Sequence, residues 1–174
     1  MAEYKTLCPK IIKITALILA FLLLVKTFLC FLLSFAILEE PPEDWPQRLK
    51  EVQMFLWPLL DDCHPKWYSW FSLILNAVGV VVYSYMYFGI LNTHKFNLLV
   101  GLIGVTAYLI VSVPAHIVLW ILHTRPHTMM TLNCMGTAVS VICSPLSYIH
   151  YRRILNDERI QEMEESEYAE SKKK

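Results

Sequence analysis

Apolar residues in this chain gather into four long runs and do not alternate with polar ones. The runs cover residues 14–38, 67–90, 98–122 and 129–149. A bilayer core about 30 Å thick needs about 20 apolar residues in a helix, so each run is long enough to cross it. Continuous runs predict helices, because membrane-spanning strands alternate between apolar and polar positions. The sequence therefore predicts an all-α fold, a bundle of four transmembrane helices within residues 1–149.

The segments that join the runs are unequal in length. Residues 39–66 form one long loop, whereas residues 91–97 and 123–128 are short turns. Short turns make spans two, three and four antiparallel neighbours. The last segment, residues 150–174, is polar. We expect it to be a cytoplasmic tail that is helical beyond the membrane.

The composition agrees with a membrane protein. Apolar and aromatic residues make up 56% of the 174 residues and charged ones only 17%, and the mean hydropathy is +0.44. A soluble domain carries roughly 25% charged residues. The 15 basic residues balance 15 acidic ones. A neutral chain with so few charges argues against an ordinary soluble enzyme and against binding of nucleic acid.

Basic residues predict the orientation, because short cytoplasmic segments are enriched in Lys and Arg. With both termini in the cytoplasm, that side holds most of these residues, namely Lys5, Lys10, Lys13, Lys95, Arg152, Arg153, Arg159, Lys172, Lys173 and Lys174. The outer side holds Arg48, Lys50, Lys66 and Arg125. We expect this orientation in the plasma membrane, with an endomembrane of the endoplasmic reticulum or lysosome as the alternative.

The first run also allows a second interpretation. Its basic start and the small residues Ser34 and Ala36 resemble a signal peptide cut after Ala36, which would leave three spans. The apolar run continues well past Lys26, however, and is too long for such a peptide. Four spans remain the prediction.

The long loop predicts an amphipathic helix on the outer side. Asp44 suits the helix cap and Pro46 the first turn. Apolar residues then recur at helical spacing, and their face would contact a partner protein or lie on the membrane surface. The predicted contact face consists of Leu49, Val52, Leu56 and Trp57.

The chain has no pattern that indicates catalysis or a cofactor. Asp61, Asp62, Cys63 and His64 are metal-ligand types, but four adjacent residues cannot all point at one ion. The motifs of serine hydrolases, zinc proteases and phosphate-binding loops are missing from the sequence. We expect neither a metal nor another cofactor, and no enzymatic activity.

Lys26 is the most informative residue, because it is the only charged residue within the runs and lies near the middle of its span. A charge at this depth is costly and suggests a functional role. No Asp or Glu occurs in any run, so its options are amide and hydroxyl oxygens, backbone carbonyls, a lipid-exposed defect in the bilayer, neutralisation or a partner's carboxylate. Counting 1.5 Å per residue predicts a polar layer at mid-membrane, comprising Lys26, Asn76, Thr106 and Ser140. A second layer nearer the outer side would contain His116 and Asn133.

The layout of four spans, short termini and a larger first outer loop resembles two groups of small membrane proteins. These are the LAPTM lysosomal family and the Pasiflora-type four-span proteins of insect septate junctions. The resemblance is one of topology and carries over no residue roles. Together with the residues, it implies a non-enzymatic protein that assembles, sorts or scaffolds partner membrane proteins, at cell junctions among other sites. Its partners would be the lipid bilayer and other membrane proteins or further copies of itself. The alternative is a small transporter or channel subunit that uses the layer around Lys26.

Overall fold

The computed structural model describes residues 2–39, 66–122 and 128–172. Within these ranges the regular structure is entirely helical: α1 (Ala2–Glu39), α3 (Lys66–Leu91), α4 (Lys95–Leu122) and α5 (Thr128–Ser171). All four helices are long and apolar enough to cross a membrane. The prediction of a four-span, multi-pass membrane protein in a lipid bilayer is thereby confirmed. The predicted loop helix, with Leu49, Val52, Leu56 and Trp57, lies outside the described residues.

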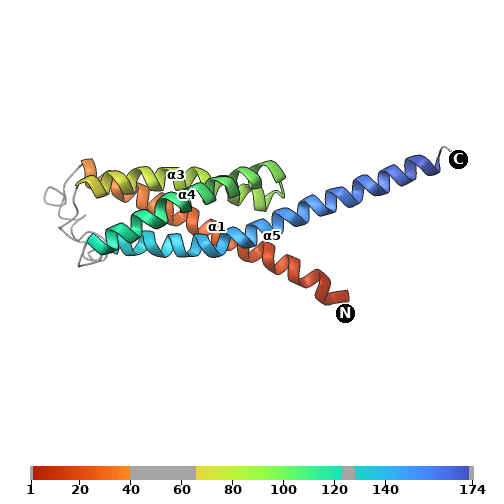
Figure 1. Cartoon of the computed structure of the whole chain (residues 1–174), viewed down its shortest axis with the longest axis horizontal. Helices are drawn as coiled ribbons and strands as arrows, with labels where there is room; N and C mark the ends of the chain where they lie inside the picture. Colours follow the sequence, from red (N-terminus) through yellow and green to blue (C-terminus); the bar gives the residue numbers. More distant parts are fainter. Residues whose placement is uncertain (1, 40–65, 123–127, 173–174) are drawn as a thin grey trace.

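The helices form a bundle in which each contacts two main neighbours. Helices α1 and α4 each pack against both α3 and α5, whereas α3 and α5 scarcely touch. Figure 1 shows that the two chain termini lie at the same end of the bundle as the α3–α4 turn. An even number of spans produces this arrangement. Both termini therefore lie at one end of the bundle.

The inside of the bundle holds polar side chains beside a core of apolar ones, and many further large apolar side chains point outward. Side chains of Ser, Thr, Asn and His are buried between the helices; they are Thr27, Ser34, Ser72, Asn76, Ser112, His116, Asn133, Thr137, Ser140, Ser147 and His150. Many Ile, Leu, Val and Phe side chains on all four helices are exposed, including Ile18, Ile74, Ile103 and Ile142. A soluble bundle has the opposite pattern, so the exposed apolar surface fits contact with lipid.

Small residues let α3 and α4 approach closely. A Cβ atom at Gly101 would lie 2.7 Å from both the backbone N and Cα of Met86, and one at Gly89 would lie 2.5 Å from the backbone N of Leu98. Only glycine fits at such contacts between two backbones. The connecting turn contains Thr93 with a φ of 52°, in the left-handed region. The N–H of the next residue, His94, donates to the carbonyl of Gly89 and closes the end of α3.

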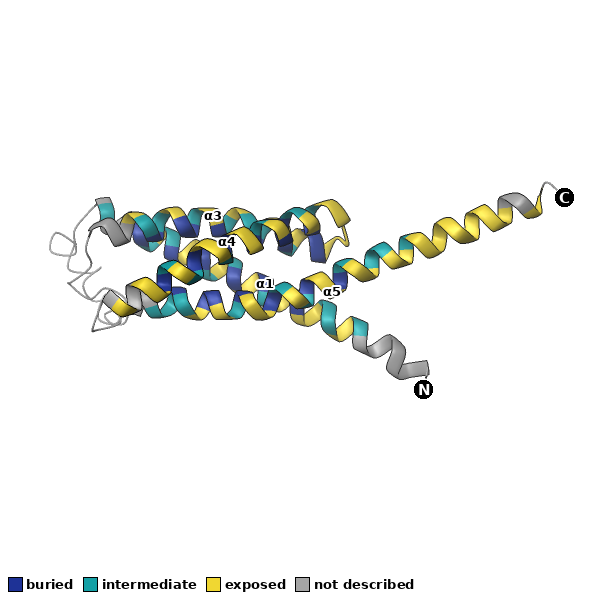
Figure 2. Cartoon of the chain, viewed as in Figure 1, coloured by how far each residue is buried: buried dark blue, intermediate teal, exposed yellow. Residues whose placement is uncertain are grey.

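Helix α5 continues far beyond the bundle. It has 44 residues, which at 1.5 Å per residue is about 66 Å, roughly twice the thickness of a bilayer core. Ile154 still packs on the core, but every described side chain from Arg159 onward is exposed. Figure 2 shows this last part of α5 as an almost uniformly exposed rod. The polar segment after residue 149 is therefore a direct extension of the fourth span.

Candidate functional site

The ammonium group of Lys26 lies inside the bundle and is held by two side-chain amides. Its Nζ donates to Oδ1 of Asn133 on α5 at 2.6 Å and to Oδ1 of Asn76 on α3 at 3.4 Å. Both asparagines are almost completely buried. Of the partners that the sequence left open for the Lys26 amine, the structure shows the amide oxygens of two asparagines. Lys26 thus joins three helices by hydrogen bonds from one side chain.

The amide nitrogens of the two asparagines are satisfied by serines. Nδ2 of Asn76 donates to the carbonyl and the hydroxyl of Ser72, at 2.7 and 3.1 Å. Nδ2 of Asn133 reaches the same hydroxyl at 3.3 Å. The hydroxyl of Ser34 on α1 lies 3.1 Å from that of Ser72. We call Lys26, Ser34, Ser72, Asn76 and Asn133 the polar cluster; it links α1, α3 and α5 in one hydrogen-bond network.

Gly136 makes room for the lysine stem. A Cβ atom at this position would lie 3.0 Å from Nζ of Lys26 and 3.1 Å from its Cε. Helix α5 therefore presents bare backbone where Lys26 crosses toward Asn133. The Lys26 amine enclosed in this way has neutral acceptors on two helices and forms no ion pair with an acid among the described residues. Neutral amide dipoles lower the cost of the buried charge without a salt bridge.

The two predicted layers are arranged differently in space. Asn76 lies beside Lys26, and Asn133, placed in the other layer by depth, lies beside it as well. The Lys stem passes Gly136 and its amine reaches Asn133, and an amine at the end of a four-carbon stem need not lie at the depth of its Cα atom. Ser140 instead pairs with the hydroxyl of Tyr83 and donates to the carbonyl of Gly136.

The remaining two predicted residues lie away from the polar cluster. Thr106 is exposed on the outer side of α4, and its hydroxyl donates to the carbonyl of Leu102 at 2.8 Å. His116 is buried, and its Nδ1 bonds the carbonyl of Ser112 one turn earlier in α4. Its Nε2 has no hydrogen-bond partner within the part of the chain that the structure describes.

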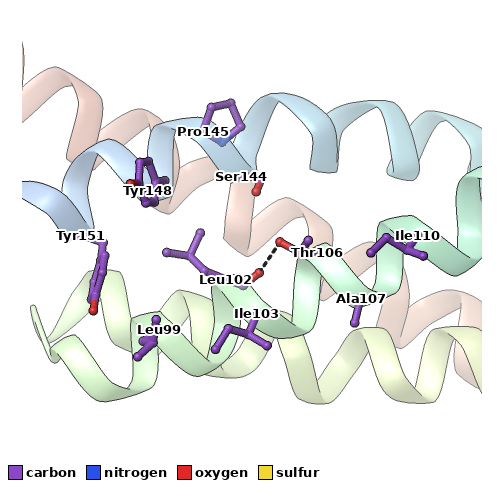
Figure 3. A pocket seen from close by; sticks show the side chains of 10 residues that line it. All are labelled: Leu99, Leu102, Ile103, Thr106, Ala107, Ile110, Ser144, Pro145, Tyr148 and Tyr151. Atoms are coloured by element: carbon purple, nitrogen blue, oxygen red, sulfur yellow. Dashed lines mark hydrogen bonds between the residues drawn. The ribbon is translucent and has the colours of Figure 1, made fainter.

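Thr106 lines a groove on the described surface. This groove has a volume of about 690 Å³ and runs between α4 and α5. Figure 3 shows the Thr106 hydroxyl turned to its own helix, while Ile103, Ile110 and Pro145 contribute apolar walls. An open apolar groove on a membrane-facing surface suits hydrocarbon chains.

Ser34 and Ser72 are members of the polar cluster that the sequence analysis did not select. A signal for both exists in the sequence. Ser72 and Asn76 are one helical turn apart, and Ser34 lies two turns beyond Lys26, so each pair shares a helix face. Serine is so common in membrane helices that its presence alone does not mark it as a site residue. The pairing with asparagine and lysine on one face is what distinguishes these two.

Comparison of the chain with protein-family models, with curated proteins and with solved structures found no match. The resemblance to small four-span families therefore remains one of layout. The chemistry of the polar cluster has to be argued from its own residues. Among them are one amine, two amides and two hydroxyls, and none of these is an acid. Such a set joins helices well, and the hydrogen bonds of the Lys26 amine go to the two asparagines.

Proposed function

We propose that this protein is a non-enzymatic membrane protein that assembles or scaffolds partner membrane proteins, with both termini in the cytoplasm. The observation that carries the proposal is the continuity of α5 from the bundle core to Ser171. One helix contributes Asn133 to the polar cluster and ends as a free rod. A partner that binds this rod would be held in a fixed position relative to the membrane bundle.

The surface of the rod supports contact with another protein. From Arg159 to Tyr168 it carries four glutamates but also two neighbouring apolar side chains, Ile160 and Met163, that are 41% and 52% exposed. These two are three residues apart and share one face. Isolated helices of this length are marginal in water, so packing against a partner would stabilise the rod.

The polar cluster favours the transporter or channel alternative, because it places polar groups at membrane depth. Its geometry supports scaffolding more strongly. The Asn76 and Asn133 amides are engaged with Lys26 and Ser72, and the bundle's exposed surface is largely apolar. A conducting path would require polar groups that face a continuous opening.

The decisive experiment compares two double variants of the full-length protein in a mild detergent. Ile160→Ser with Met163→Ser removes the apolar face of the rod, whereas Glu162→Ser with Glu165→Ser makes the same replacement on the opposite face. Scaffolding predicts that a specific membrane protein co-purifies with the parent chain and with the glutamate variant but not with the apolar-face variant. Loss with both variants, or with neither, contradicts this assignment of the contact.

A second measurement tests the alternative directly. The purified protein alone is reconstituted into liposomes, and solute and ion flux are recorded. We expect no flux above that of empty liposomes. Flux that disappears in an Asn133→Leu variant would show that the protein is a transporter or channel subunit and would overturn the scaffolding proposal.

A further inference from the structure

A polar cavity lies at the end of the bundle that carries the two termini. It has a volume of about 330 Å³ and is lined by residues of α1, the α3–α4 turn and α5. Its basic side chains come from two helices: Lys10 and Lys13 from α1, and Arg153 from α5. A cavity between elements far apart in sequence is a feature of the folded bundle and not of one helix face.

The basic residues outnumber the acidic residues that face them. Asp157 and Glu158 also line the cavity, but each already has a basic partner. Asp157 Oδ2 lies 3.7 Å from Nε of Arg153, and Glu158 Oε2 lies 3.0 Å from Nζ of Lys95. Lys10 and Lys13 form no ion pair with any residue whose side chain the structure describes. The cavity therefore keeps an excess of positive charge.

His150 gives the cavity a further polar group. It lines the cavity and is only 7% exposed, and its Nε2 has no hydrogen-bond partner among the described residues. A buried ring nitrogen without a partner is costly, and such atoms are uncommon in folded proteins. An acceptor bound in the cavity would satisfy it.

The cavity is also located where the apolar surface of the bundle ends. One and two turns further into the bundle from Lys10, the exposed side chains of α1 are Ile14 and Ile18, and Ile149 is exposed just before His150 on α5. Acyl chains would contact these side chains. The basic side chains then lie at the level of lipid headgroups, where such residues attract anionic lipids.

We propose that this cavity binds the phosphate group of an anionic membrane lipid. Lys10, Lys13 and Arg153 supply charge-assisted hydrogen bonds to the phosphate oxygens, and His150 donates through Nε2. The site requires a phosphate group whose oxygens accept hydrogen bonds from both α1 and α5. A bound lipid of this kind would hold α1 against α5 at the membrane surface. The proposal stands apart from the scaffolding function and does not depend on it.

The test uses native mass spectrometry of the purified full-length protein with phosphatidic acid or phosphatidylcholine. We expect phosphatidic acid to bind about tenfold more tightly, and Lys10→Gln with Lys13→Gln to remove about tenfold of that affinity. The matched control is Arg152→Gln, since Arg152 neighbours Arg153 but does not line the cavity. It should leave binding unchanged. Circular dichroism checks that each variant keeps its helices, and Lys13→Gln alone replaces the double variant if that one does not.

Three results would overturn the proposal. Equal loss with Arg152→Gln would show diffuse attraction to the surface. Equal binding of the two lipids would show that the cavity does not recognise a net negative headgroup, because phosphatidylcholine carries a phosphate whose charge its choline group balances. Thermal stabilisation by inorganic phosphate at the concentration where phosphatidic acid acts would assign the cavity to a free anion and not to a lipid.

Discussion

The ammonium of Lys26 on α1 and the amide oxygen of Asn133 on α5 lie 2.6 Å apart, although the two residues are separated by 107 positions in the chain. The contact closes the bundle between its first and last helices. A charge that is already accepted by amides of its own chain does not need a partner's carboxylate. The polar cluster is therefore a connection within the protein, and partner binding has to be sought on other surfaces.

The first prediction concerns the coupling between these two residues. Asn133→Leu leaves the Lys26 charge with one weaker acceptor and should lower the free energy of unfolding by about 3 kcal/mol. Lys26→Leu removes the charge together with its desolvation cost, so the loss should be smaller, about 1–2 kcal/mol from the unpaired amide oxygens. The double variant should be more stable than the sum of the two losses implies. Unfolding by SDS titration of the purified protein measures all three.

Additive losses in that cycle would show that the hydrogen bond contributes nothing. The same Lys26→Leu variant should keep every co-purifying membrane protein, because Lys26 faces its own chain. Loss of one specific partner would contradict this and restore a docking role for the lysine.

A second prediction contrasts two glycines. Gly101→Ala places a methyl group against the backbone of Met86, which cannot yield without separating α3 from α4. We expect a loss of about 2–3 kcal/mol. Gly136→Ala meets only the side chain of Lys26, and its cost should be about 1 kcal/mol or less, because the end of a lysine can move. Thermal melts in detergent would rank the two, and the opposite order would contradict the close approach of α3 and α4.

A third prediction concerns the α3–α4 turn. Thr93 has a φ of 52°, a conformation that costs a residue with a Cβ atom about 1 kcal/mol relative to glycine. Thr93→Gly should therefore stabilise the protein. Thr93→Ala loses the same hydroxyl but keeps the Cβ atom, so it serves as the matched control and should show no gain. Equal melting temperatures of the two variants would exclude strain at this residue.

A fourth prediction tests topology by cysteine labelling from outside intact cells. In a background without the five native cysteines, single cysteines replace Glu43, Lys5 and Lys172 in turn. A membrane-impermeant reagent should label the position at Glu43 and miss the other two, because both termini face one side of the bundle and basic residues favour the cytoplasm. Labelling at Lys172 in intact cells would reverse the orientation. Labelling at only one of Lys5 and Lys172 would contradict the four-span arrangement.

The spans were predictable from the sequence because lipid imposes one simple requirement on every residue of a crossing helix. Long apolar runs satisfy it, and α1, α3, α4 and α5 contain the four predicted runs. The buried polar residues were predicted only in part: Thr106 is exposed, and Ser34 and Ser72 were not selected, whereas Asn76, His116, Asn133 and Ser140 are buried as expected. The apolar runs do not reveal how each helix is rotated about its own axis. That rotation turns Thr106 outward, toward the α4–α5 groove, and Asn76 inward to Lys26.

The position of Asn133 shows a second limit of prediction from the sequence. Counting residues gives the depth of a Cα atom, whereas a lysine charge lies at the end of a four-carbon stem. The stem of Lys26 reaches past Gly136 to Asn133. Which direction it takes depends on space left by a helix more than a hundred residues later, and that space is a property of the folded bundle. The sequence did predict a helical tail after residue 149, and the structure shows that this tail continues the fourth span without a break to Ser171.

The unbroken course of α5 makes the last span a lever. From Ile154, the last α5 residue packed on the core, to Ser171 the helix extends about 26 Å at 1.5 Å per residue. A tilt of the span by about 10° would displace the far end by about 4 Å, and a rotation of the span would turn Ile160 and Met163 to a new bearing. Changes in bilayer thickness that alter the tilt would thereby become movements in water. A partner bound to this part of α5 would therefore change its position relative to the bundle when the thickness of the bilayer changes.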